Sequence, residues 1–93
     1  MVTTENIIQH LTGILGIPFQ EVESSNILLQ GYDEKSRILY LVFRTKGDQT
    51  PQWVYQYKIN AIVYKNFLNS GSKGHFLNEV IKPFVICKSP LNL

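Results

Sequence analysis

The fold of this sequence is decided by the stretch Ser24 to Phe84, and within it by the run Trp53-Val54-Tyr55-Gln56-Tyr57. Because side chains alternate along a strand, Trp53, Tyr55 and Tyr57 share one face, and Gln52, Val54 and Gln56 share the other. We expect the aromatic face to be buried under helices, since two glutamines make the opposite face suited to water. The alternative is an exposed aromatic face that stacks on unpaired bases.

Two further strands precede this run. Asn26 to Tyr32 has the pattern of a strand, and Tyr32 to Arg37 has the Asp and Ser residues typical of a tight reversal. The next segment, Ile38 to Phe43, is apolar on both faces, which predicts a central strand covered from two sides. A long polar loop, Arg44 to Gln52, then leads to the third strand.

Helices are predicted after the third strand. Asn60 can cap a helix that runs to about Asn69 and leaves through Gly71, and Ser72 can cap a second, short helix that Pro83 ends. The segment Phe84 to Cys87 is apolar and could add a fourth strand.

The N-terminal segment predicts one more helix. Thr4 can cap it, Gly16 and Pro18 end it, and its apolar side consists of Ile7, Ile8, Leu11, Ile14 and Leu15. A helix of this length is marginally stable in water by itself. We therefore expect its apolar side to pack on the rest of the chain; the alternative is packing on a partner protein.

The sequence therefore predicts an α+β fold. We expect an antiparallel three-stranded meander, with a possible fourth short strand, packed with an N-terminal helix and two short C-terminal helices. The expected organisation is an N-terminal helical arm at 1–23, a domain at 24–84 and a C-terminal tail at 85–93. A chain of 93 residues has room for one hydrophobic core.

Composition indicates the cellular compartment that we expect for the protein. Cys87 is the only cysteine, so no intramolecular disulfide can form, which favours a reducing, cytoplasmic compartment. No basic residue precedes the first apolar positions, so we expect no signal peptide. No 18 consecutive residues are apolar, so we expect no membrane partner.

Charge is distributed unevenly along the chain. Residues 1–34 contain five acids and no Lys or Arg, a net charge of −5, whereas residues 35–93 contain all nine Lys and Arg against Asp48 and Glu79, a net charge of +7. A boundary at residue 24 keeps the same signs, with −3 before it and +5 after it. This asymmetry favours a polyanionic partner for the C-terminal part.

The turn Ser70-Gly71-Ser72-Lys73-Gly74-His75 allows two interpretations. Its glycines could let backbone amides bind an anion at a helix N-terminus, with Lys73 adding a charge. The alternative, which we favour, is an ordinary turn between helices, with Ser72 as the cap. It does not match the GxxxxGK[ST] pattern of a phosphate-binding loop.

Several segments together resemble one small family. They are Ser24-Ser25-Asn26-Ile27, Tyr32-Asp33, Leu39-Tyr40-Leu41-Val42-Phe43, Tyr55-Gln56-Tyr57 and Ser72-Lys73-Gly74-His75-Phe76-Leu77-Asn78. In order and spacing they are similar to the KTSC domain, which is named for the C-terminus of some lysyl-tRNA synthetases and also occurs as small separate proteins. That attachment implies RNA binding as a candidate activity. The sequence departs from the family in its long loop at 44–52, in Asn60 where a proline is common, and in His75 where a basic residue is common.

We therefore expect a small, non-enzymatic binding module. The first hypothesis is RNA binding through a basic surface, with a site formed by Arg37, Arg44, Lys46, Tyr55, Tyr57, Ser72, Lys73 and His75. The second is a protein interaction module, an adaptor or inhibitor, that uses the N-terminal helix or an open sheet edge for a partner or a second copy. The two histidines, Cys87 and the scattered carboxylates show no catalytic or metal-binding spacing, so we expect neither an enzyme nor a cofactor or metal.

Overall fold

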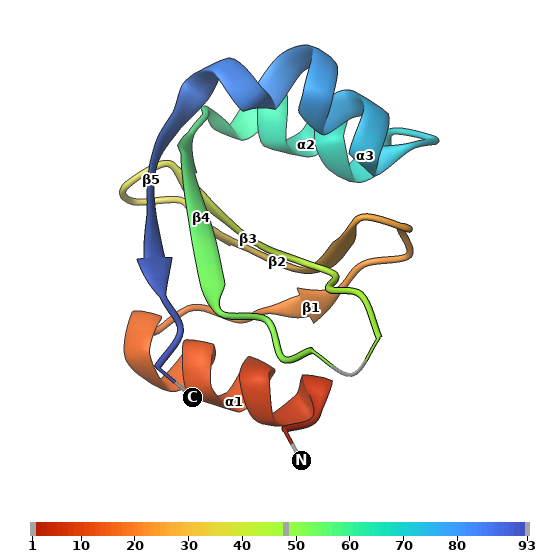
Figure 1. The fold of residues 1–93 in the computed structure, drawn as a ribbon. Helices are drawn as coiled ribbons and strands as arrows, with labels where there is room; N and C mark the ends of the chain where they lie inside the picture. The colour runs from red at the N-terminus through yellow and green to blue at the C-terminus, as the bar shows by residue number, and fades with distance from the viewer. Residues whose placement is uncertain (1, 48, 93) are drawn as a thin grey trace.

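A computed structural model describes residues 2–47 and 49–92. Met1, Asp48 and Leu93 lie outside the described residues, and Asp48 belongs to the loop expected at 44–52. Its strands form one antiparallel sheet in the order in which they follow along the chain (Figure 1). They are β1 (Gln20–Glu21), β2 (Ile27–Asp33), β3 (Ile38–Phe43), β4 (Trp53–Lys58) and β5 (Val85–Pro90). The α+β class is confirmed, and the meander has five strands where three or four were expected.

Helices cover both faces of this sheet. Helix α1 (Thr4–Leu15) lies on one face, and α2 (Ala61–Asn69) and α3 (Lys73–Phe76) lie on the other (Figure 1). Helix α3 continues into a π-helical turn, η1 (Leu77–Ile81), and a 3₁₀ turn, η2 (Lys82–Phe84), which leads into β5. The result is three layers with the sheet in the middle.

Strand β3 is the central strand, as its apolar pattern predicts. Tyr40 and Val42 pack in the hydrophobic cluster beneath α1, whereas Leu39 and Leu41 pack in the cluster beneath α2 and α3. Burial on two sides explains why no polar residue alternates along this strand.

Helix α1 docks on the chain's own sheet, as expected. Ile7 and Leu11 are each 2% exposed within the cluster on that face. The cap is Thr3 and not Thr4: its side chain accepts from the Asn6 amide at 3.1 Å, and the Asn6 side chain accepts from the Thr3 amide. Gly16 ends the helix in the left-handed conformation, with φ of 72°, as expected.

The expectation for the faces of β4 is partly wrong. Val54 is 4% exposed and packs beneath α1, so the face that carries Gln52 and Gln56 is not a wet face. Tyr57 is buried on the opposite face, as expected, but Trp53 at the start of the strand is 39% exposed. The face of Val54 is thus covered by α1, whereas the aromatic face is buried at Tyr57 and opens toward the N-terminal end of β4.

The two outer strands come from the segments expected to form the arm and the tail. Gln20 and Glu21 pair with Gln30 and Leu29, a strand too short and polar for its pattern to indicate. The tail pairs with β4 from Trp53–Pro90 to Tyr57–Val85, which confirms the extra C-terminal strand and extends it to Pro90. The two ends of the chain also meet, because His10 Nε2 lies 2.6 Å from the carbonyl oxygen of Leu91.

The expected caps of the C-terminal helices are confirmed. The Asn60 side chain accepts from the Val63 amide at 2.9 Å, and Ser72 Oγ accepts from the His75 amide at 3.3 Å. The exit of α2 differs from expectation, because Gly71 does not adopt a positive φ. Across residues 2–47 and 49–92, no helix has the length and apolar character needed to cross a bilayer.

Candidate nucleic-acid interface

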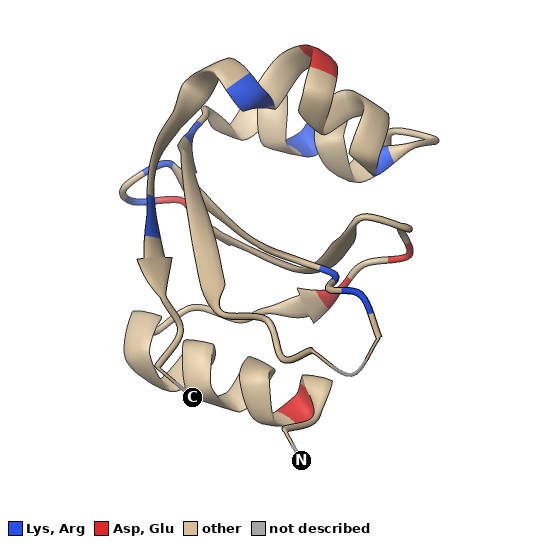
Figure 2. Cartoon of the chain, in the orientation of Figure 1, with Lys and Arg blue, Asp and Glu red and all other residues tan. Residues whose placement is uncertain are grey.

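The expected basic residues do not form one surface. Arg37 lies in the turn between β2 and β3, with φ of 61°, whereas Arg44 and Lys46 follow the opposite end of β3. A six-residue strand separates these positions, a distance of about 20 Å. Figure 2 shows Lys and Arg distributed over both ends of the sheet and over the helices. A short RNA could therefore contact only some of the expected residues at once.

The side chain of Arg44 is hydrogen-bonded to the backbone of the protein itself. Its Nε donates to the Ser24 carbonyl at 2.6 Å and its Nη2 donates to the Val22 carbonyl at 2.9 Å. Its own amide donates to the carbonyl of Asn26. These three bonds hold the segment between β1 and β2 against the end of β3.

The two tyrosines of the expected site differ in their accessibility. Tyr57 is 4% exposed, and burial raises its pKa to about 12, so its ring is part of the core. Tyr55 is half-buried and packs edge-on against Phe43, with ring centroids 5.1 Å apart. Of the two, only Tyr55 keeps a surface that a ligand could reach.

An aromatic and basic surface remains at the open end of β4. Trp53 is exposed, and Lys88 Nζ, from the neighbouring strand β5, lies 4.4 Å from its ring centroid. Beside them is a hollow of 320 Å³. It is lined by Phe43, Arg44, Thr45, Pro51, Gln52, Trp53 and Tyr55.

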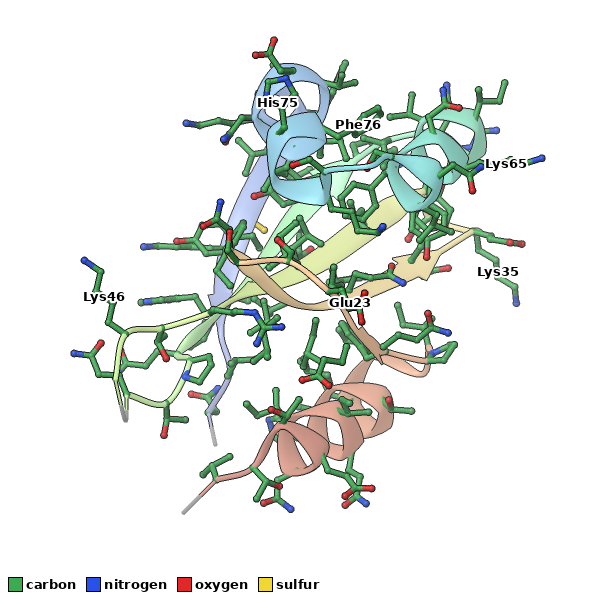
Figure 3. The ribbon with its side chains drawn as sticks, turned by 90° about the vertical axis from the view of Figure 1, so that its right-hand side faces the viewer. Glu23, Lys35, Lys46, Lys65, His75 and Phe76 are labelled. Atoms are coloured by element: carbon green, nitrogen blue, oxygen red, sulfur yellow. The ribbon has the colours of Figure 1, made fainter. Side chains whose placement is uncertain are left out.

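Lys46 adds a second cation, in the loop that precedes β4. Its side chain extends away from the body of the protein (Figure 3). Its neighbour Thr45 lines a further hollow together with Trp53. We refer to Trp53, Tyr55, Lys46 and Lys88 as the aromatic end. Trp53 is absent from the expected site because its face of the strand was expected to be buried. Lys88 is absent because the pairing that brings it to Trp53 joins segments distant in sequence.

The other expected residues lie at a second, polar hollow of 350 Å³. It is formed where the loop before β2 faces the start of α3, and it is lined by Glu23, Ser24, Ser25, Asn26, Gly71, Ser72, Lys73, Gly74, His75 and Asn78. Gly74 is needed for close approach, since a Cβ there would lie 3.1 Å from Asn26 Nδ2. The structure thus brings together Ser72, Lys73 and His75, but apart from the aromatic end.

The electrostatics of this polar hollow are mixed. Glu23 is on its rim, and His75 Nε2 lies 3.9 Å from Glu79 Oε1 on the same exposed helix face. The His75 amide is already used by the Ser72 cap. These contacts place two carboxylates at or near the polar hollow, whereas the described residues that line the two hollows beside Trp53 include no acid.

No metal-binding cluster of three or more His, Cys, Asp or Glu residues occurs in the described part of the chain.

Comparison with known proteins identifies the family of this chain. Residues 23–84 match the KTSC domain family. The structure is similar to the crystal structure of a KTSC domain protein from Yersinia pestis, with a TM-score of 0.65 and 35% identity, covering 80% of this chain and 96% of that one. No curated protein was found to match. The residues of the resemblance at 24–26, 72–75 and 78 line the polar hollow. The sequence and the structure agree in showing that this chain belongs to the KTSC domain family.

Proposed function

We propose that this protein is a small RNA-binding module that holds unpaired nucleotides at its aromatic end. The observation that supports this most directly is the exposed ring of Trp53 with the Lys88 ammonium 4.4 Å above it. An aromatic ring flanked by cations suits single-stranded RNA, because a base can stack on the ring while the cations contact phosphate.

The geometry suits a short segment of strand. Tyr55 lies two residues from Trp53 on the same face of β4, so the two rings offer neighbouring apolar surfaces. Lys88 approaches from β5 and Lys46 from the loop before β4. Cations on both sides of the rings would follow the backbone of a strand that crosses this end of the sheet.

Arg37 and Tyr57 have no direct part in this proposal. Arg37 is at the far end of the β2–β3 hairpin, and Tyr57 is buried. Arg44 borders the hollow, but its guanidinium already donates to two carbonyls. Ser72, Lys73 and His75 belong to the polar hollow.

Binding can be followed with the protein's own fluorophore, since Trp53 is its only tryptophan. Titration with a single-stranded RNA should quench the Trp53 emission, and anisotropy of a labelled RNA should give the same affinity. Trp53→Ala should weaken the affinity by about 5- to 100-fold, the range expected for one lost stacking contact.

The salt dependence of the RNA affinity tests whether the lysines contact phosphate. Each phosphate contact adds about −0.7 to the log–log slope of affinity against salt for a single strand, so Lys46→Ala should flatten the slope by about 0.7. Arg37→Ala removes the same charge at the far end of the hairpin and is the matched control. Equal effects of Lys46→Ala and Arg37→Ala, or no quenching of Trp53 at low salt, would refute the proposal. A labelled hairpin and tRNA, compared in the same assay, would show whether the bases must be unpaired.

A further inference from the structure

The polar hollow has two walls that come from different layers of the fold. One wall is the segment 23–26, which precedes β2, and the other consists of residues 71–75 and Asn78 at the start of the C-terminal helical segment. Figure 3 shows Glu23 on the sheet side and His75 on the helical side. The described residues that line the hollow include no large apolar side chain. An apolar ligand would leave these polar groups unpaired, so the hollow suits a small polar molecule.

Both walls are held in place by contacts within the protein. Two hydrogen bonds from the Arg44 side chain fix the backbone before β2, and Ser24 Oγ accepts from the Asn26 amide at 3.1 Å. On the helical side, Ser72 Oγ accepts from a backbone amide at 3.3 Å. The walls meet at the buried Gly74, where an added Cβ would lie 3.1 Å from Asn26 Nδ2. Walls fixed in advance lower the cost of ordering the site around a ligand.

The walls also offer donors and acceptors to a ligand. The hydroxyl oxygens of Ser24 and Ser72 act as acceptors in the contacts above, so each hydroxyl keeps its O–H to donate. Asn26 and Asn78 add amide side chains, each of which carries both a donor and an acceptor. These groups come from both walls, so a ligand between them can be held from two sides.

Two opposite charges line the hollow, one from each wall. The carboxylate belongs to Glu23, which is exposed, and the ammonium belongs to Lys73, which is half-buried. The ion pair found in the described part of the chain joins His75 to Glu79, so Glu23 and Lys73 do not pair with each other across the hollow. Glu23 would repel an anion and Lys73 would repel a cation, whereas a molecule with one charge of each sign satisfies both.

We propose that the polar hollow binds a small zwitterion, a free α-amino acid with a polar side chain, with its carboxylate toward Lys73 and its ammonium toward Glu23. The hydroxyls of Ser24 and Ser72 donate to the carboxylate, and the amide oxygens of the two asparagines accept from the ammonium. The volume of 350 Å³ equals that of about ten water molecules, which is enough for an amino acid with a short side chain. This site is separate from the aromatic end and does not depend on RNA binding.

The affinity should be modest, because water screens charged contacts at a site that is open to solvent. We expect a dissociation constant of about 1 mM for L-serine, so titration to about 50 mM should approach saturation. Backbone amide chemical shifts in ¹⁵N-labelled protein detect binding in this range. The amides of Ser25, Asn26 and Gly74 should shift together along one saturation curve, because they belong to the two walls.

Two derivatives of the ligand test the two charges separately. N-acetyl-L-serine lacks the ammonium, and L-serinamide lacks the carboxylate. Each should bind about 3- to 10-fold more weakly than L-serine, the loss expected for one charged contact at an open site. Inorganic phosphate, an anion without an ammonium, should also bind more weakly than L-serine, because Glu23 repels it.

Two variants assign each ligand charge to its protein partner. Glu23→Gln should weaken L-serine by about 3- to 10-fold and leave N-acetyl-L-serine unchanged, because that derivative has no ammonium. Lys73→Gln should weaken L-serine to the same degree and leave L-serinamide unchanged. Lys65→Gln is the matched control, since Lys65 is exposed on α2 and its side chain points away from the hollow (Figure 3). The amide spectra of all three variants show whether the fold is retained.

Three results would overturn the proposal. The first is that L-serine leaves the amides of both walls unshifted. The second is that N-acetyl-L-serine or phosphate binds as tightly as L-serine, which would make the hollow a simple anion site. The third is that Lys65→Gln weakens L-serine as much as Lys73→Gln does. Each of these results leaves the RNA proposal intact, because quenching of Trp53 is measured separately.

Discussion

Arg44→Ala separates a structural cation from a phosphate-binding one. Arg44 was expected to contact RNA, but its guanidinium donates to the carbonyls of Ser24 and Val22 at 2.6 and 2.9 Å. Hydrogen bonds from charged donors are worth about 1.5 to 3 kcal/mol each, and the side chain is exposed, so the lower values apply. Part of the loss would be recovered by water. We expect the free energy of unfolding to fall by about 2 kcal/mol.

Chemical denaturation followed by circular dichroism measures this change. Lys46→Ala, in the same loop, is the control, since Lys46 extends into solvent and its removal should change stability by less than about 0.5 kcal/mol. Arg44→Lys should recover only part of the stability, because an ammonium cannot reproduce the planar set of donors.

RNA binding gives the complementary measurement. Arg44→Ala should leave the salt slope nearly unchanged under conditions where the protein stays folded, whereas Lys46→Ala should flatten it. The reasoning is wrong if Arg44→Ala keeps full stability and flattens the salt slope as Lys46→Ala does. Arg44 would then contact phosphate, and its carbonyl contacts would contribute no net stability.

Three further predictions concern the core. Gly31→Ala should lower the free energy of unfolding by about 1 to 3 kcal/mol, because the added Cβ would lie 3.0 Å from the ring of Phe19. Gly13→Ala, in α1 with open space around it, should raise the free energy of unfolding by about 0.5 to 1 kcal/mol. Urea denaturation measures both changes. Tyr64→Phe should cost about 1 to 2 kcal/mol in the same assay, because the Tyr64 hydroxyl donates at 2.7 Å to the amide oxygen of buried Gln30. Burial raises the pKa of Tyr57 to about 12, so its hydroxyl loses its proton at a lower pH in the unfolded state than in the folded state. The free energy of unfolding should therefore fall by about 2 kcal/mol between pH 10 and 12. Tyr57→Phe should reduce this decline.

Each of these predictions has a result that contradicts it. Equal effects at Gly31 and Gly13 would show that the sheet moves away from the ring without cost. If Gln30→Met fails to restore stability to Tyr64→Phe, the loss does not come from an unpaired amide oxygen. An alkaline stability curve identical for the native protein and Tyr57→Phe would show that Tyr57 titrates as an exposed tyrosine.

The sequence predicts best where a local pattern determines the structure. The double-sided apolar run at 38–43 became the central strand with its expected bounds, because covering both faces requires such a run. Asn60 and Ser72 cap their helices as expected, and Gly16 ends α1, since a cap depends on residues only a few positions away.

The sequence predicts least where distant segments decide the outcome. Val54 was assigned to a wet face because alternation alone does not reveal that α1 covers that face. The contacts of Arg44 are to backbone carbonyls about twenty residues earlier, and any residue type provides such carbonyls. Strand β1 has only two polar residues, and only its pairing with β2 identifies it.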